Sequence, residues 1–142
     1  MNDSFDINSP SPNTQHTAKF GFSGEVRFGP PYYVLSVDDY SFGQRTFGSA
    51  HLWSQSSNLL AAQEWLTLDY SEGPITALVI IDVNRGREAT VARSAKRFLV
   101  PEAFDDSIIR YREENAGLGL AKHFDMDITK IKGWKALRPK RS

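Results

Sequence analysis

The segment "WSQSSNLLAAQEW", residues 53–65, decides between two fold classes. Its Leu-Leu-Ala-Ala-Gln-Glu run is rich in good helix formers, and Asn58 is a suitable N-cap for such a helix. The same residues also alternate as a strand would, with Leu60 and Ala62 on one face. Local propensity alone therefore favours a helix over residues 57–67, and only the neighbouring sequence favours a strand.

The residues that follow this segment form the strongest strand pattern in the chain. "ITALVIIDV", residues 75–83, is continuous, β-branched and apolar, which is typical of a strand buried on both faces. "NRG", residues 84–86, provides a short loop with a glycine for a left-handed position, and "REATVAR", residues 87–93, returns as an antiparallel strand. Since hairpins surround it, residues 53–65 are interpreted as the turn and second strand of a hairpin, with the helix kept as the alternative.

A family resemblance supports the hairpin. In many β-propeller blades an aromatic-Ser pair ends the inner strand, a polar turn leads to a Leu-Ala strand, and a hydrophobic-Asp-hydrophobic triplet ends the third strand. Residues 50–93 resemble one such blade through Leu52-Trp53-Ser54, Ser57, Leu60-Ala61, Ile81-Asp82-Val83 and Gly86. The resemblance implies a four-stranded antiparallel meander. A whole propeller needs at least four blades of about 40–45 residues, for which this chain has no room.

The N-terminal half contributes another hairpin and a further strand. "KFGFSGEVRF", residues 19–28, alternates apolar and polar residues, and Gly24 is a candidate bulge position. "YYVLSV", residues 32–37, follows after Gly-Pro-Pro and is rich in aromatic and β-branched residues. "RTFGSAHLW", residues 45–53, is a weaker strand because a glycine interrupts it.

The C-terminal half predicts a second meander. "KRFLV" (96–100), "SIIRYRE" (107–113) and "LGLAKHFDMDI" (118–128) are short strands, and the last has its apolar residues on one parity. "PEAFDD", residues 101–106, is either a single helical turn or a loop. Roughly nine or ten antiparallel strands must then cover their apolar faces by closing on one another. The predicted fold is mainly β, with antiparallel meanders closing into a sandwich or barrel-like single domain and little helix.

The domain organisation follows from length and local composition. A chain of 142 residues is most simply one domain. Residues 1–18 are polar and contain two prolines, so we expect a flexible N-terminal arm. Residues 19–137 form the predicted single β-rich domain, and residues 138–142 form a basic tail.

Composition restricts the environment and the partners. The 17 basic and 17 acidic residues balance, so no overall field attracts nucleic acid or a membrane surface. The absence of cysteine excludes disulfides and thiol nucleophiles. The acidic, polar N-terminus does not match a secretory signal, and no apolar run reaches the ~20 residues of a membrane-spanning helix. We therefore expect a soluble, cytoplasmic protein that does not bind membranes.

The chemistry-bearing residues do not form a recognisable catalytic pattern. His16, His51 and His123 lack the spacing of metal ligands on one element, and the carboxylates are scattered. Neither a Gly-x-Ser-x-Gly elbow nor a phosphate-binding loop is present. The sequence therefore predicts no enzyme activity, no metal and no cofactor.

The C-terminal segment combines basic residues with a tryptophan. Its candidate basic patch consists of Lys130, Lys132, Lys135, Arg138, Lys140 and Arg141. Basic and aromatic side chains together bind phosphates and stack on bases, which gives a nucleic-acid interface as one hypothesis. We favour instead a solubilising terminus in which Trp134 and Leu137 pack against the domain, so nucleic acid is not the expected partner.

The aromatic content is high for one small core and suggests an interaction surface. The candidate surface for a protein partner or ligand consists of Tyr32, Tyr33, Tyr40, Phe42 and Trp65. Edge strands also invite pairing with a second copy. The expected function is a non-catalytic protein-binding module, such as an inhibitor, an adaptor or an immunity-type partner. The first alternative is a barrel or sandwich that binds a small ligand, and the second is nucleic-acid binding through the basic C-terminal segment.

Overall fold

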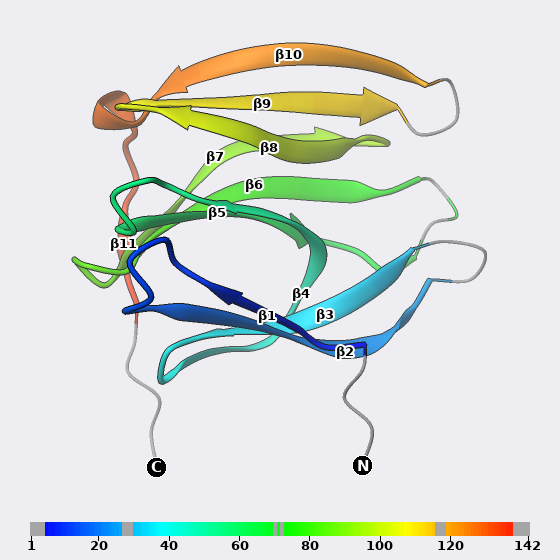
Figure 1. The fold of residues 1–142 in the computed structure, drawn as a ribbon. Helices are drawn as coiled ribbons and strands as arrows, with labels where there is room; N and C mark the ends of the chain where they lie inside the picture. Colours follow the sequence, from blue (N-terminus) through cyan, green and yellow to red (C-terminus); the bar gives the residue numbers. More distant parts are fainter. Residues whose placement is uncertain (1–4, 27–29, 70, 72, 116–118, 138–142) are drawn as a thin grey trace.

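The computed structural model describes residues 5–26, 30–69, 71, 73–115 and 119–137. They form two antiparallel sheets and one short 3₁₀ helix, η1 (Ile128–Lys130). In spatial order, the larger sheet contains β1 (Ile7–Pro10), β2 (Thr17–Glu25), β3 (Pro31–Val37), β4 (Tyr40–Trp53), β5 (Leu59–Trp65), β6 (Ile75–Asp82), β7 (Arg87–Ala95) and β11 (Lys135–Ala136). The smaller sheet contains β10 (Leu120–Asp127), β9 (Ile108–Asn115) and β8 (Phe98–Asp105) (Figure 1). The prediction of a mainly β fold of antiparallel meanders is confirmed.

The segment with high helix propensity is a strand. In β5, Leu60 and Ala62 are fully buried on one face, and Ala61 is fully buried on the other. A helix would present only one stripe of side chains to a core, whereas this position has a core on both sides. Burial in tertiary structure therefore overrides the local preference, and the predicted hairpin of residues 53–65 is confirmed.

Two hydrophobic cores lie on opposite faces of the middle of the larger sheet. The first core lies within the curl of that sheet and includes Ala18, Phe20, Tyr33, Leu35, Phe47, Leu60, Val79 and Ile81. The second core lies between the two sheets and is formed by Ala61, Leu78, Ile80, Leu99, Ile109 and Tyr111. Successive residues of β6 alternate between the two cores, which explains the continuous apolar run from Ile75.

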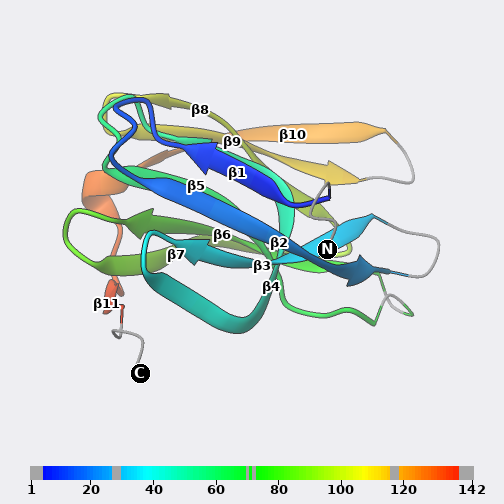
Figure 2. The same cartoon turned by 60° about the horizontal axis from the view of Figure 1, so that its bottom comes forward.

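The architecture is a pair of packed sheets rather than a closed barrel. The larger sheet curls because β4 bends sharply where its pairing with β5 shifts register, between Phe47 and His51 (Figure 1). Its edge strands β1 and β11 do not pair with each other among the described residues. The smaller sheet covers the outer face of β5, β6 and β7, as Figure 2 also shows. The four strands β4 to β7 form the meander implied for residues 50–93.

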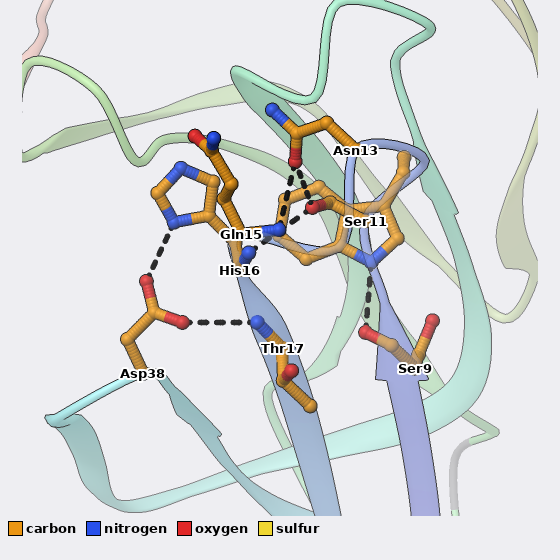
Figure 3. Close-up of polar contacts among 8 residues, drawn as sticks. Ser9, Ser11, Asn13, Gln15, His16, Thr17 and Asp38 are labelled. Atoms are coloured by element: carbon orange, nitrogen blue, oxygen red, sulfur yellow. Dashed lines mark hydrogen bonds and ion pairs between the residues drawn. The ribbon is translucent and has the colours of Figure 1, made fainter.

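The structure differs from the flexible arm expected over residues 1–18 in the described part of that segment, residues 5–18. The strand β1 pairs with β2, and the turn between them is held by internal hydrogen bonds (Figure 3). His16 Nδ1 lies 2.7 Å from Asp38 Oδ2, and the Trp53 indole donates to the Ser9 carbonyl over 3.0 Å. Polar composition suggested disorder, but partners on β4 and on the β3–β4 turn satisfy these groups.

The second meander differs from expectation in two places. Residues 101–106 were expected to be a helical turn or a loop, but β8 continues through Pro101 to Asp105 with a register shift against β9, and only Asp106 lies in a turn. The strand β10 forms as predicted, but its apolar face extends past the second core. Leu120 is 64% exposed and Phe124 is 40% exposed.

Candidate functional site

A hollow lies at one end of the packed sheets, where three hairpin turns meet the C-terminal segment. It has a volume of about 660 Å³, within the usual range of about 300–1,000 Å³ for small-molecule sites. We call it the turn-end groove and define it by its lining residues Ser56, Asn58, Leu59, Asp82, Asn84, Arg85, Arg87, Ser107, Ile128, Thr129, Ile131 and Trp134.

The β4–β5 turn forms one wall of the turn-end groove. Ser57 N donates to the Ser54 carbonyl over 3.0 Å, and Ser57 itself has a φ of 66°. The Ser54 hydroxyl oxygen accepts from Leu59 N over 3.1 Å and lies 3.0 Å from the Ser56 hydroxyl. A serine-rich turn can satisfy its own backbone in this way, so residues 54–58 are fixed without an aromatic or charged anchor.

The β6–β7 turn places two arginines on the groove. Asp82 is 7% exposed, and its carboxylate accepts from Arg85 N over 3.0 Å and from Arg87 Nε over 3.3 Å. Gly86, with a φ of 64°, supplies the left-handed residue that closes the turn. The carboxylate of Asp82 therefore holds the backbone of one arginine and the side chain of the other.

The C-terminal segment forms the apolar floor. Trp134 lies against the second core, and its ring is covered by the Arg87 guanidinium, whose carbon is 4.2 Å from the ring centroid. Ile131 N donates to the Ile128 carbonyl over 3.1 Å, which closes η1. β11 then pairs with the beginning of β7. The expected packing of Trp134 and Leu137 against the domain is confirmed.

Thr129 links the groove to a carboxylate that stays ionised. Asp127 Oδ1 accepts from the Thr129 hydroxyl over 2.6 Å and from Thr129 N over 3.0 Å. These hydrogen bonds hold the pKa of Asp127 below its ordinary value. The Thr129 hydroxyl therefore donates its proton to Asp127, and its oxygen can still accept a hydrogen bond from a ligand.

Most of the charged side chains on the lining of the turn-end groove are basic, and the Asp127 carboxylate lies behind Thr129. The lining includes two arginines and one aspartate, which gives a net charge of +1. Asp82 is neutralised by Arg87, but no hydrogen bond joins either Nη atom of Arg87 to another described residue. The Arg85 side chain likewise has no hydrogen bond or ion pair with the described part of the chain. Guanidinium donors beside an apolar floor suit a carboxylate or phosphate attached to an apolar group.

The expected aromatic surface is not assembled. Tyr33, Phe42 and Trp65 are buried, at 6%, 4% and 4% exposure. Tyr32 and Tyr40 are half-buried; Tyr32 lies beside the Trp65 ring, and Tyr40 packs edge-on to Phe42. The bent larger sheet has room for more aromatic side chains than a core of ordinary size, so their number did not indicate exposure.

The structure describes half of the candidate basic patch. Lys130, Lys132 and Lys135 are exposed around η1 and β11, whereas Arg138, Lys140 and Arg141 lie outside the described residues. Trp134, the aromatic member of that hypothesis, has its ring against the protein and under Arg87, so it does not present a free face for base stacking.

The three histidines lie apart from the turn-end groove. His16 contacts Asp38, His51 Nε2 lies 2.8 Å from the Ser9 hydroxyl, and His123 Nδ1 lies 2.9 Å from Glu102 Oε1. The Ser11 hydroxyl donates to Asn13 Oδ1 and accepts from His16 N, so it is not aligned with the His16 ring as a nucleophile would be. Within the described residues, no three potential metal-ligating side chains form a group.

A partly buried ion cluster lies beside Phe42 and Phe47 of the first core. Arg45 donates to both Glu64 and Glu88 over 2.8–3.0 Å. Burial lowers the pKa of Arg45, but the hydrogen bonds and charges of the two glutamates outweigh it and raise the pKa above its usual value. Each donor and acceptor here is already engaged, so we regard the cluster as structural.

Sequence reasoning missed the residues that form the groove. Asn58, Asn84, Arg85 and Arg87 were interpreted only as turn or strand residues. The sequence did contain one signal. The serine-rich turn at residues 54–58 and the Asn-x-Gly turn at residues 84–86 follow alternate strands of one meander, so both turns lie at the same end of the sheet. The participation of Ser107 and Thr129 depends on how the smaller sheet packs, which local sequence does not indicate.

No protein-family model matches the chain, and no curated protein or solved structure matches it. The resemblance of residues 50–93 to a propeller blade therefore stays an expectation. Among the described residues, no helix is long and apolar enough to cross a membrane.

Proposed function

We propose that this protein is a non-catalytic binding domain that takes a small organic anion in the turn-end groove. The observation that carries the proposal is the arrangement of Arg87, which Asp82 and Trp134 hold in place while its Nη atoms keep free donors. An arginine fixed by its neighbours loses little side-chain entropy when it binds a ligand.

The lining residues suggest which part of a ligand each would contact. Arg85 and Arg87 would bind a carboxylate or phosphate, because guanidinium groups match both in geometry and charge. Leu59, Ile128 and Ile131 offer apolar side chains for the rest of the molecule. Asp82 is the single carboxylate on the described lining, and its pairing with Arg87 makes it unsuitable as a general base.

The geometry supports this function better than the two other hypotheses. A protein-binding module was expected from exposed aromatic side chains, of which three are buried. The nucleic-acid hypothesis, the second alternative, depends on basic residues interleaved with a tryptophan, and Trp134 is covered by Arg87. A small-ligand site required a pocket of roughly 300 Å³ or more, and the groove exceeds that volume.

The proposal is tested by titrating the ¹⁵N-labelled protein with phenyl phosphate, benzoate and phenol. We expect saturable shifts from the two anions in amides of residues 56–59, 82–87 and 128–134, and weak or no shifts from phenol. Arg85→Ala should weaken binding of phenyl phosphate roughly tenfold, because a charge-assisted hydrogen bond is lost.

Arg93→Ala is the matched control, since Arg93 is an exposed arginine on β7 away from the groove lining. It should bind phenyl phosphate as the unmodified protein does. Shifts that are absent, that do not saturate, or that remain unchanged in Arg85→Ala would overturn the proposal.

A further inference from the structure

Most strand edges in this fold are covered or interrupted. The free side of β8 receives side chains of the larger sheet: Gln63 Nε2 donates to the Leu99 carbonyl, and the Thr76 hydroxyl contacts both Leu99 N and the Arg97 carbonyl. β1 is four residues long, ends at Pro10 and is contacted by Trp53. Such devices prevent pairing with another chain.

The edge formed by β7 and β11 is also poorly suited to pairing with another strand. β11 is two residues long and covers only the beginning of β7. Beyond it, the pairing of β7 with β6 shifts register at Leu78 and Val79, which leaves Val91 as an extra residue on the edge. A bulge of this kind bends the edge away from the flat geometry that a new strand needs.

β10 has none of these devices. It pairs with β9 over eight consecutive residues without a register shift, and it forms the outer edge of the smaller sheet (Figure 1). Phe124 stacks on Tyr111, with ring centroids 5.4 Å apart, yet 40% of it is exposed. Leu120 is 64% exposed on the same face. β10 is therefore a long, regular edge that carries uncovered apolar side chains.

The residues of β10 are complementary to a second copy of themselves in one register. In an antiparallel pair with two-fold symmetry, a central residue lies opposite itself, and its neighbours lie opposite each other. If Phe124 is central, Phe124 meets Phe124, and His123 meets Asp125 twice. His123 Nδ1 already contacts Glu102, which leaves Nε2 to face Asp125 of the second copy.

The neighbouring registers are less favourable. Centring on Lys122 places two ammonium groups opposite each other, and like charges directly opposite are destabilising. Centring on His123 places two imidazoles opposite each other and leaves Asp125 facing Ala121. Of these three registers, the order of side chains along β10 favours the one centred on Phe124.

We propose that two copies of this protein associate edge to edge through antiparallel β10 strands centred on Phe124. The association would extend the smaller sheet from three strands to six and cover the apolar side chains of both edges. This inference is independent of the turn-end groove and of its ligand.

The first test is sedimentation across a concentration series. We expect a monomer–dimer equilibrium that Asp125→Lys and His123→Glu each weaken roughly tenfold or more, since each removes the pairing of unlike groups. The double variant H123E/D125K restores unlike charges across the two-fold axis and should restore association. Asp105→Lys, an exposed charge reversal on β8, is the control and should leave association unchanged.

The second test uses the absence of cysteine from the chain. Lys122→Cys, His123→Cys and Phe124→Cys each introduce one thiol, and mild oxidation should cross-link F124C fastest because that position lies on the two-fold axis. A protein that stays monomeric at every concentration, a double variant that fails to restore association, or fastest cross-linking at position 122 or 123 would overturn the proposal.

Discussion

Gln63 donates from Nε2 to the Leu99 carbonyl over 2.8 Å and thereby joins the two sheets. It is 5% exposed, so water cannot readily replace it. We expect Gln63→Met to lower the free energy of unfolding by about 2 kcal/mol, because a buried carbonyl loses its donor. Urea denaturation measures the loss, with Gln55→Met in the exposed β4–β5 turn as control. Equal stability of Q63M and the unmodified protein would contradict the assignment.

Gly48 is expected to be intolerant of any side chain. A Cβ at this position would overlap Gln63 Oε1 and lie 2.7 Å from Trp65 Nε1, both on buried side chains. Gly48→Ala should therefore destabilise the protein by about 1–3 kcal/mol through overpacking. The control is Gly21→Ala, whose Cβ would meet its nearest neighbour, Val34, at 3.4 Å. Thermal denaturation compares the two variants, and G48A should have the lower midpoint. A G48A midpoint at or above that of G21A would exclude steric overlap as the reason that position 48 is a glycine.

Arg87 and Trp134 should be energetically coupled. The guanidinium lies 4.2 Å from the ring centroid, a distance typical of a cation–π contact. A double-mutant cycle with Arg87→Met and Trp134→Leu should give a coupling energy of about 1 kcal/mol. Chemical denaturation of the four proteins measures it. Additive losses in the two single variants would mean that the contact does not stabilise the fold.

Asp127 should titrate at higher pH when Thr129 cannot donate. The hydroxyl and backbone amide of Thr129 lower the pKa of Asp127 in the folded state. A carboxyl with a lowered pKa stabilises the fold above its ordinary pKa of about 3.9, and that contribution is lost as the pH falls through the folded value. Thr129→Val should move the pKa back towards the ordinary value, as carboxyl-detected NMR titration would show. Thr90→Val, at an exposed position on β7, should leave it unchanged.

Strands whose own residue pattern indicates a β-strand were predictable from the sequence. Residues 75–83 are apolar at nearly every position because β6 faces a core on each side. The bulge expected at Gly24 is present as a register shift in the pairing of β2 with β3. Residues 59–65 required context, since their propensity favoured a helix and only neighbouring hairpins indicated a strand.

The remaining features depend on how far one sheet overlaps the other. Phe124 and Trp65 have similar apolar character, yet one lies beyond the second core and the other is buried beneath the bend of β4. Pro101 suggested the end of a strand, but a register shift accommodates it within β8. The groove was likewise not predictable, because it forms where turns from both sheets converge.

Because β6 contributes side chains to both cores, it affects how the protein unfolds. Leu78 and Ile80 belong to one core, while Val79 and Ile81 belong to the other. Neither core can be opened without exposing one side of the same strand, so the two sheets cannot act as separable folding units. Detachment of the smaller sheet would expose Leu78 and Ile80 to water. Opening of the curled part of the larger sheet would expose Val79 and Ile81 on the opposite face. The protein should therefore melt in one cooperative step, with the amides of β6 the slowest to exchange with solvent.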